Sequence, residues 1–217
     1  MLRTTCPNIS VITNFGCRAK CWYCIWKGHP LEYVNDKTDW IALEKFLSDN
    51  KEKGKVSISG GGDCLYKYSE HIDWWGKFFS ITDKLDMLVD VHTREKFFVD
   101  SFWVERINRC VFSSDKISDD KDYLIYLSKL TKIRVTHLVT ADTTLELIEE
   151  YLDFQRKTGC QFTVKQLIGY DDNGMYRIVR NTYPETYSLD AGDYNIYYMP
   201  DNRIYTSFLL ERGLIWR

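Results

Sequence analysis

Short apolar runs alternate along this chain with segments of helical pattern. The predicted strands are rich in Val, Ile, Leu and Phe and lie at residues 8–14, 55–59, 84–92, 109–113, 133–140 and 161–169. The predicted helices between them lie at residues 39–49, 69–81, 95–106, 119–130 and 144–157. Apolar strands joined by helical crossovers are typical of parallel sheets. The sequence therefore predicts an α/β fold of right-handed βαβ units, either an open doubly wound sheet or an incomplete barrel.

Local signals mark the ends of the last two predicted helices. Thr143 and Glu146 match a T-x-x-E capping box, and Gly159 stands where a left-handed helix cap is expected. Ser118 is the candidate N-cap of the preceding helix. These signals place both helices between strands, as the alternation requires.

The pattern changes after Gly169. Residues 171–174 read Asp-Asp-Asn-Gly, which is a turn, and residues 195–199 and 203–207 flank Pro-Asp-Asn as the arms of a β-hairpin. We therefore expect a barrel-like domain at residues 1–169 and a C-terminal hairpin extension at residues 170–217.

Composition limits the compartment and the class of partner. Lys and Arg number 29 and Asp and Glu number 31, so the net charge of −2 gives no electrostatic argument for binding duplex nucleic acid. No apolar run reaches the roughly 18 residues of a membrane span. The first ten residues lack a signal-peptide pattern. We expect a cytoplasmic protein with no membrane partner.

Cysteine spacing is the most informative chemical feature of the chain. Three of the seven cysteines, Cys17, Cys21 and Cys24, have the spacing C-x3-C-x2-C directly after the first predicted strand. An odd number of cysteines without an export signal argues against a disulfide framework. Three thiolates this close can hold one metal centre and leave a coordination position open, which on an iron–sulfur cluster is a site for chemistry.

Three other interpretations of the cysteines stay open. A structural zinc site would need a fourth ligand, for which His29 or Cys6 can serve, although zinc sites usually pair two knuckles and no second knuckle is present. An electron-transfer iron–sulfur protein would also need a fourth ligand, such as Cys6. The three thiols can also be unrelated buried residues.

The cysteine segment resembles a family signature. Cys17, Cys21 and Cys24, with Tyr23 before the last cysteine, are similar to the C-x3-C-x-aromatic-C motif of radical S-adenosylmethionine (SAM) enzymes. The resemblance covers about residues 8–170 and implies a partial (β/α)6 TIM-like barrel. It implies a [4Fe–4S] cluster on the three cysteines with SAM on the fourth iron. Reductive cleavage of SAM would then form a 5′-deoxyadenosyl radical, with an electron donor such as flavodoxin or ferredoxin.

A glycine run supports the same resemblance. The second strand ends in Gly60, Gly61 and Gly62, followed by Asp63. Glycines at a strand end allow a ligand to approach the backbone closely. The run resembles the family's GGE motif, which implies contact with the SAM amino group. This chain departs from that motif, with Asp63 in place of Glu and Cys64 in the usual Pro position.

Polar side chains at other strand ends complete the expected SAM site. The resemblance places contacts to SAM at His92, Thr93, Ser113, Thr140, Gln166 and Leu167. Arg94 and Lys27 are candidate partners for the SAM carboxylate or an anionic substrate. The alternative for each side chain is an ordinary strand-end polar group with its hydrogen bonds satisfied inside the protein.

The resemblance leaves the substrate open. We expect a hydrogen atom to be abstracted from a small-molecule or nucleoside-like substrate, with the tyrosine-rich tail as a candidate cover that can also simply pack on the barrel. Activation of a glycyl-radical enzyme and modification of a peptide are alternatives. No cysteine follows Cys160, so a single cluster is expected.

Overall fold

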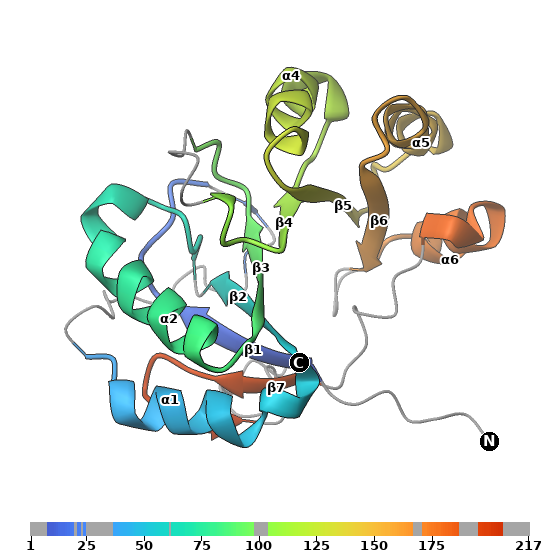
Figure 1. Ribbon diagram of the computed structural model, residues 1–217. Helices are drawn as coiled ribbons and strands as arrows, with labels where there is room; N and C mark the ends of the chain where they lie inside the picture. The colour runs from blue at the N-terminus through green and yellow to red at the C-terminus, as the bar shows by residue number, and fades with distance from the viewer. Residues whose placement is uncertain are drawn as a thin grey trace. The chain divides into compact units, whose positions relative to one another are not determined.

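The chain forms two compact α/β units, seen in a computed structural model (Figure 1). The structure describes residues 8–19, 21–22, 24, 37–60, 62–97, 104–166, 171–186 and 195–205. The first unit comprises the described residues up to Phe97, residues 106–108 and those after Gly192. The second unit comprises residues 104–105 and the described residues from Arg109 to Ala191.

The described residues of the first unit form a sheet and two α-helices. Its strands are β1 (Asn8–Thr13), β2 (Lys55–Gly60), β3 (Leu88–Thr93), β7 (Asn195–Tyr198) and β8 (Ile204–Tyr205). They lie in the order β3-β2-β1-β7-β8, and only β8 is antiparallel to its neighbour. The helices are α1 (Trp40–Asp49) and α2 (Ile72–Lys84), with 3-10 turns η1 (Lys51–Lys53) and η2 (Tyr68–His71).

Apolar side chains on one face of this sheet form the core of the first unit. The strand register aligns Ile9, Val56 and Val89 in one buried row. Phe15 follows β1 and packs edge-on against Trp74 of α2, with ring centroids 5.2 Å apart. Each fully buried side chain of this size contributes about 1.5–3 kcal/mol, so the core holds the ends of β1 and β2 in place.

The second unit has a three-stranded parallel sheet. Its strands are β4 (Arg109–Ser113), β5 (Lys132–Val139) and β6 (Gln161–Gln166), with β5 in the middle. Its helices are α4 (Ile117–Ser128), α5 (Leu145–Thr158) and α6 (Met175–Thr182), and η3 (Pro184–Thr186) follows. The rings of Tyr151 on α5 and Phe162 on β6 stack at 4.6 Å, and Phe112 on β4 contacts Tyr123 on α4.

The predicted α/β class is confirmed, while several element boundaries are shifted and two regions differ most from the prediction. The third strand begins at Leu88 rather than at residue 84, because α2 continues to Lys84 and a turn with Asp86 at a φ of 54° follows. Of the helix predicted at 95–106, residues 95–97 are not helical, and residues 98–103 lie outside the described part. The end of the sixth predicted strand, residues 167–169, also lies outside it.

Two predicted helix caps are wrong and one is confirmed. The N-cap of α5 is Thr144, whose hydroxyl accepts from the Leu147 amide, and not Thr143. Helix α4 begins at Ile117 after Lys116, so Ser118 lies inside it. Gly159 ends α5 with a φ of 74°, and its amide donates to the Gln155 carbonyl, as a left-handed cap requires.

The predicted hairpin is confirmed over the described residues, with an additional pairing. Strands β7 and β8 pair antiparallel, and β7 also pairs parallel with β1, so that Ile9 lies opposite Ile196. This part of the expected extension therefore belongs to the same sheet as the first strand. The boundary predicted between residues 169 and 170 stays a prediction. No helix in the described part of the chain is long and apolar enough to cross a membrane.

A buried histidine links the strands and helices of the second unit. His137 on β5 is 5% exposed, with Nδ1 3.2 Å from the Ser114 carbonyl and Nε2 3.1 Å from the Thr143 hydroxyl. The Tyr151 hydroxyl donates to the same carbonyl, and the Thr140 amide donates to the Thr143 hydroxyl. A neutral imidazole satisfies both contacts, with Nδ1 as the donor. The Thr143 hydroxyl therefore bonds within this network and does not cap helix α5.

This network predicts a loss of stability at acid pH. Burial lowers the pKa of His137 in the folded chain, so the unfolded chain binds the proton first as the pH falls. The contribution of neutral His137 to the free energy of unfolding should be fully present above about pH 6.5. As the pH decreases from there, the free energy of unfolding should decrease by up to about 1.4 kcal/mol per pH unit. Urea unfolding of the wild type and His137→Gln across this range measures the effect. The variant should be less stable but have a flatter pH profile.

A second histidine provides the control. Burial also lowers the pKa of His71 in the first unit, so it contributes in the same direction. His71→Gln should therefore also reduce the slope of the free energy of unfolding against pH, independently of His137→Gln. An unchanged slope in His137→Gln would contradict the role given to His137.

Candidate functional site

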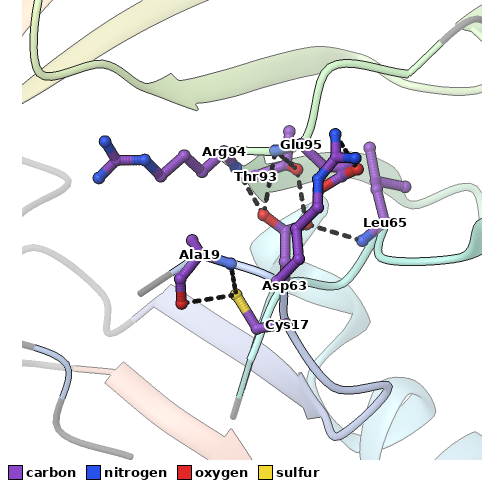
Figure 2. Close-up of polar contacts among 8 residues, drawn as sticks. Cys17, Ala19, Asp63, Leu65, Thr93, Arg94 and Glu95 are labelled. Carbon is purple, nitrogen blue, oxygen red and sulfur yellow. Dashed lines mark hydrogen bonds and ion pairs between the residues drawn. The ribbon is translucent and has the colours of Figure 1, made fainter. Parts of the chain in front are cut away.

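Three loops meet at one edge of the first unit's sheet. They follow the adjacent parallel strands β1, β2 and β3, and the carboxyl ends of parallel strands lie at the same edge. The first loop carries the three clustered cysteines, the second begins with the glycine run, and the third starts at Thr93. Figure 2 shows their polar contacts, with Asp63 between Cys17 and the third loop.

Asp63 binds the second loop to the third. Its side chain is 5% exposed, and Oδ1 accepts from the Leu65 amide at 2.9 Å and from the Thr93 hydroxyl at 2.6 Å. Oδ2 accepts from the amides of Arg94 at 2.6 Å and Glu95 at 3.2 Å (Figure 2). A carboxylate has about four lone-pair positions, and protein donors occupy that number here. Asp63 therefore holds the loops together through these four bonds, and its expected contact with the SAM amino group stays a prediction.

The first and second loops touch through their backbones. The Asp63 amide donates to the Gly16 carbonyl at 2.8 Å. A Cβ atom on Gly62 would lie 2.4 Å from that carbonyl oxygen, so only glycine fits at this position. An ion pair of 2.6 Å between Arg18 and Glu95 joins the first loop to the third. The close approach of the Gly16 backbone therefore explains the glycine at residue 62 without a ligand.

The three clustered cysteines are free thiols and are half-buried. Burial raises the pKa of the Cys17 thiol, and the charges of Asp63, Cys21 and Cys24 act in the same direction. The Ala19 amide, 3.3 Å from Cys17 Sγ, opposes this shift. The Cys24 amide donates to the Cys21 carbonyl at 3.1 Å. The three thiols are thus near enough to influence one another electrostatically.

Arg94 brings a positive charge to the cysteines. Its Nη1 atom donates to Cys21 Sγ at 3.4 Å, and its main-chain amide is held by Asp63. The guanidinium thus places a charged donor next to a sulfur of the cysteine loop. The Arg94 guanidinium lies against the Cys21 sulfur, and its predicted contact with the SAM carboxylate or an anionic substrate stays a prediction.

The arrangement of the described side chains bears on which metal centre the cysteines could hold. Within the described ranges, no three His, Cys, Asp or Glu side chains are arranged to hold one metal ion. A single zinc ion would need every ligand atom within about 2.3 Å of it. Thiolates on an iron–sulfur cluster bind different irons, so their sulfurs lie further apart. Three free thiols, one of them in contact with the Arg94 guanidinium, fit such a cluster as a set of donors. Cys6 and His29, the alternative fourth ligands, lie outside the described residues.

Two buried polar atoms stand next to the cysteine loop. Thr13 Oγ1 and Asn14 Oδ1 are at the carboxyl end of β1, and neither has a hydrogen-bond partner in the described part of the chain. Asn14 is only 8% exposed. A buried polar atom without a hydrogen bond lowers the stability of the folded protein by about 1–3 kcal/mol. A polar ligand that bonds to these atoms would restore that stability.

The other predicted site residues divide between the two units. Gly60 ends β2 opposite Thr13, and the His92 carbonyl accepts from the Cys64 thiol at 3.1 Å. In the second unit, Ser113 ends β4, Thr140 follows β5, and Gln166 ends β6, where it donates to Asp172 at 3.3 Å. Tyr23, Gly61, Leu167 and Lys27 lie outside the described residues. Contact of these residues with SAM stays a prediction.

Sequence reasoning missed Gly16, Arg18 and Glu95. Each lies within three residues of a predicted site residue, and the available signal was the opposite charges of Arg18, which follows β1, and Glu95, which follows β3 on the other side of β2.

This chain was compared with protein-family models and with curated proteins. No family model matches it, and no curated protein matches it.

Proposed function

We propose that this chain is a radical SAM enzyme with one [4Fe–4S] cluster on Cys17, Cys21 and Cys24. The observation that carries the proposal is the position of three free thiols in the loop at the carboxyl end of β1, against the loops after β2 and β3. The C-x3-C-x2-C spacing supports it. The family's partial (β/α)6 barrel is part of the proposal.

Each of the three loops has a task in this proposal. The cysteines hold the cluster, and Arg94 offsets the negative charge at Cys21. Asp63 fixes the third loop and so directs Arg94 toward the sulfur. A cluster held by these cysteines would supply one-electron reduction of SAM, which would yield methionine and the 5′-deoxyadenosyl radical. Asn14 Oδ1 is available as an acceptor for a polar group of a ligand at this edge.

The proposed reaction is abstraction of a hydrogen atom from a small-molecule or nucleoside-like substrate. A flavodoxin- or ferredoxin-like protein would supply the electron. Activation of a glycyl-radical enzyme and modification of a peptide use the same chemistry on a larger partner. These substrate classes differ in what the second unit and the tail must bind, and not in the cysteine loop.

Metal content tests the proposal against a zinc-binding module. Protein purified and reconstituted without oxygen should be brown and should contain about four irons and four sulfides per chain. Exposure to air should bleach it. Colourless protein that holds one zinc and excludes iron after reconstitution would contradict the proposal.

A further inference from the structure

The turn between β7 and β8 binds the residues that precede helix α1. Asn202 lies in this turn with a φ of 61°, a left-handed conformation that asparagine adopts more readily than most residues. Its Oδ1 atom accepts from the Asp39 amide at 2.9 Å, and its Nδ2 atom donates to the Lys37 carbonyl at 2.7 Å. One side chain therefore satisfies two main-chain groups directly before the helix.

Tyr198 on β7 binds the same segment. Its hydroxyl lies 3.2 Å from the Asp39 carbonyl and 3.0 Å from Asn202 Oδ1, and either oxygen can accept its hydrogen. Burial, together with the charges of Asp39 and Asp201, raises the pKa of Tyr198 to about 12, so the hydroxyl stays a donor at neutral pH. Its ring centroid lies 5.6 Å from that of Phe46 on α1, which runs beside β7 (Figure 1). The hairpin therefore holds α1 by polar contacts and by packing.

The hairpin also pairs with the strand that leads into the cysteine loop. Tyr198 lies opposite Val11 of β1 in the strand register. A small cavity in the first unit is lined by Thr13 and Thr38, which stand at the two ends of the connection between β1 and α1, and by Tyr198 and Asn202. The hairpin thus touches this connection where it leaves β1 and where it enters α1. The three clustered cysteines lie within the connection.

Trp74 of α2 joins the two ends of the connection. Its Nε1 atom donates to the Thr38 hydroxyl at 3.0 Å, and its ring packs edge-on against that of Phe15, with centroids 5.2 Å apart. Phe15 is fully buried and stands two residues before Cys17. Close-packed rings leave no free space to absorb a displacement. A change at the residues before α1 should therefore reach the start of the cysteine loop through Trp74.

We infer that Asn202 and Tyr198 are positioning residues for the cysteine loop, acting through the segment before α1 and through Trp74. The bond between the Asp63 amide and the Gly16 carbonyl reports on this action, because it joins the cysteine loop to the loop after β2. The inference gives the C-terminal hairpin a part in holding the cluster ligands. The consequence for the cluster rests on the proposed function, whereas the effect on the bond between the loops does not.

Amide hydrogen exchange in the iron-free, full-length chain tests the inference. Protection of the Asp63 amide is measured by NMR in the wild type, Asn202→Gly, Tyr198→Phe and Asn173→Gly. Glycine at residue 202 accepts the positive φ but makes no side-chain bonds. Asn173 also has a positive φ, of 53°, but is exposed in the second unit, and it is the matched control. Circular dichroism and urea unfolding check that each variant is folded.

Protection of the Asp63 amide should decrease about tenfold or more in Asn202→Gly, decrease less in Tyr198→Phe, and stay unchanged in Asn173→Gly. Tyr198→Phe keeps the ring against Phe46, so it removes hydrogen bonds without opening the core. The amides of β2 that pair with β3 are the internal reference in each variant, because a general loss of stability would speed their exchange as well.

Two results would overturn the inference. One is faster exchange at the Asp39 amide of Asn202→Gly with no change at Asp63, which would confine the contacts of Asn202 to the start of α1. The other is equal acceleration at Asp63 and in β2, which would show a merely structural role.

Iron release extends the test to the proposed cluster. After anaerobic reconstitution, a chelator should remove iron about tenfold faster from Asn202→Gly than from Asn173→Gly. Equal rates would contradict the positioning of the cluster ligands. Because the exchange measurement is made without iron, failure of the wild type to form a cluster contradicts only the proposed function.

Discussion

Replacing Cys17, Cys21 or Cys24 with alanine should remove most of the iron that the wild-type chain binds. Each thiolate is expected to hold a different iron, so two remaining cysteines cannot retain the cluster firmly. All three side chains are half-buried in a loop, and therefore the loss should not unfold the sheet. Iron and sulfide assays after anaerobic reconstitution, with visible absorption, measure the effect.

Buried cysteines outside the loop are the matched controls. Cys64, Cys110 and Cys160 are buried in the two units, away from solvent. Their replacement by alanine should cost stability but leave the iron per folded chain unchanged. Retention of about four irons in all three loop variants would refute the assignment of the ligands.

Replacing Asp63 with alanine should destabilise the first unit by roughly 3 kcal/mol, because several buried donors lose one charged acceptor together. The variant should also lose iron, since the third loop and Arg94 would no longer be held against the cysteine loop. Asp63→Asn should be nearly as damaging, because its amide would face the donating main-chain N–H groups. Urea unfolding and iron per folded chain are the two measurements.

An exposed aspartate serves as the control for this variant. Asp142 lies in the loop before α5 in the second unit, and Asp142→Ala should change neither stability nor iron content by a measurable amount. A fully stable Asp63→Ala protein with normal iron content would show that the hydrogen bonds of Asp63 do not assemble the site.

Much of the site's location followed from sequence pattern alone. Strand alternation predicted that β1, β2 and β3 are parallel, and parallel neighbours place their following loops at one edge. This is why Cys17, Asp63 and Thr93 meet although they are far apart in the chain. Spacing also identified the metal-ligand candidates, because thiol chemistry depends on residue type and proximity.

The contacts that join the loops could not be predicted in the same way. Asp63 is bound mostly by main-chain amides, and every residue except proline has one, so no residue type signals them. The pairing of β7 with β1 joins opposite ends of the chain, and local pattern carries no information about it. Thr143 and Thr144 are adjacent and equally suited to a helix cap, and the buried His137 decides between them.

Reductive cleavage of SAM tests the central claim most directly. The reconstituted chain is mixed with SAM and dithionite without oxygen, and 5′-deoxyadenosine and methionine are quantified, with Cys21→Ala as the control. The wild type should form both products in equal amounts, and the control should form neither above background. A wild-type protein that carries about four irons per chain but forms no 5′-deoxyadenosine would contradict the assignment as a radical SAM enzyme.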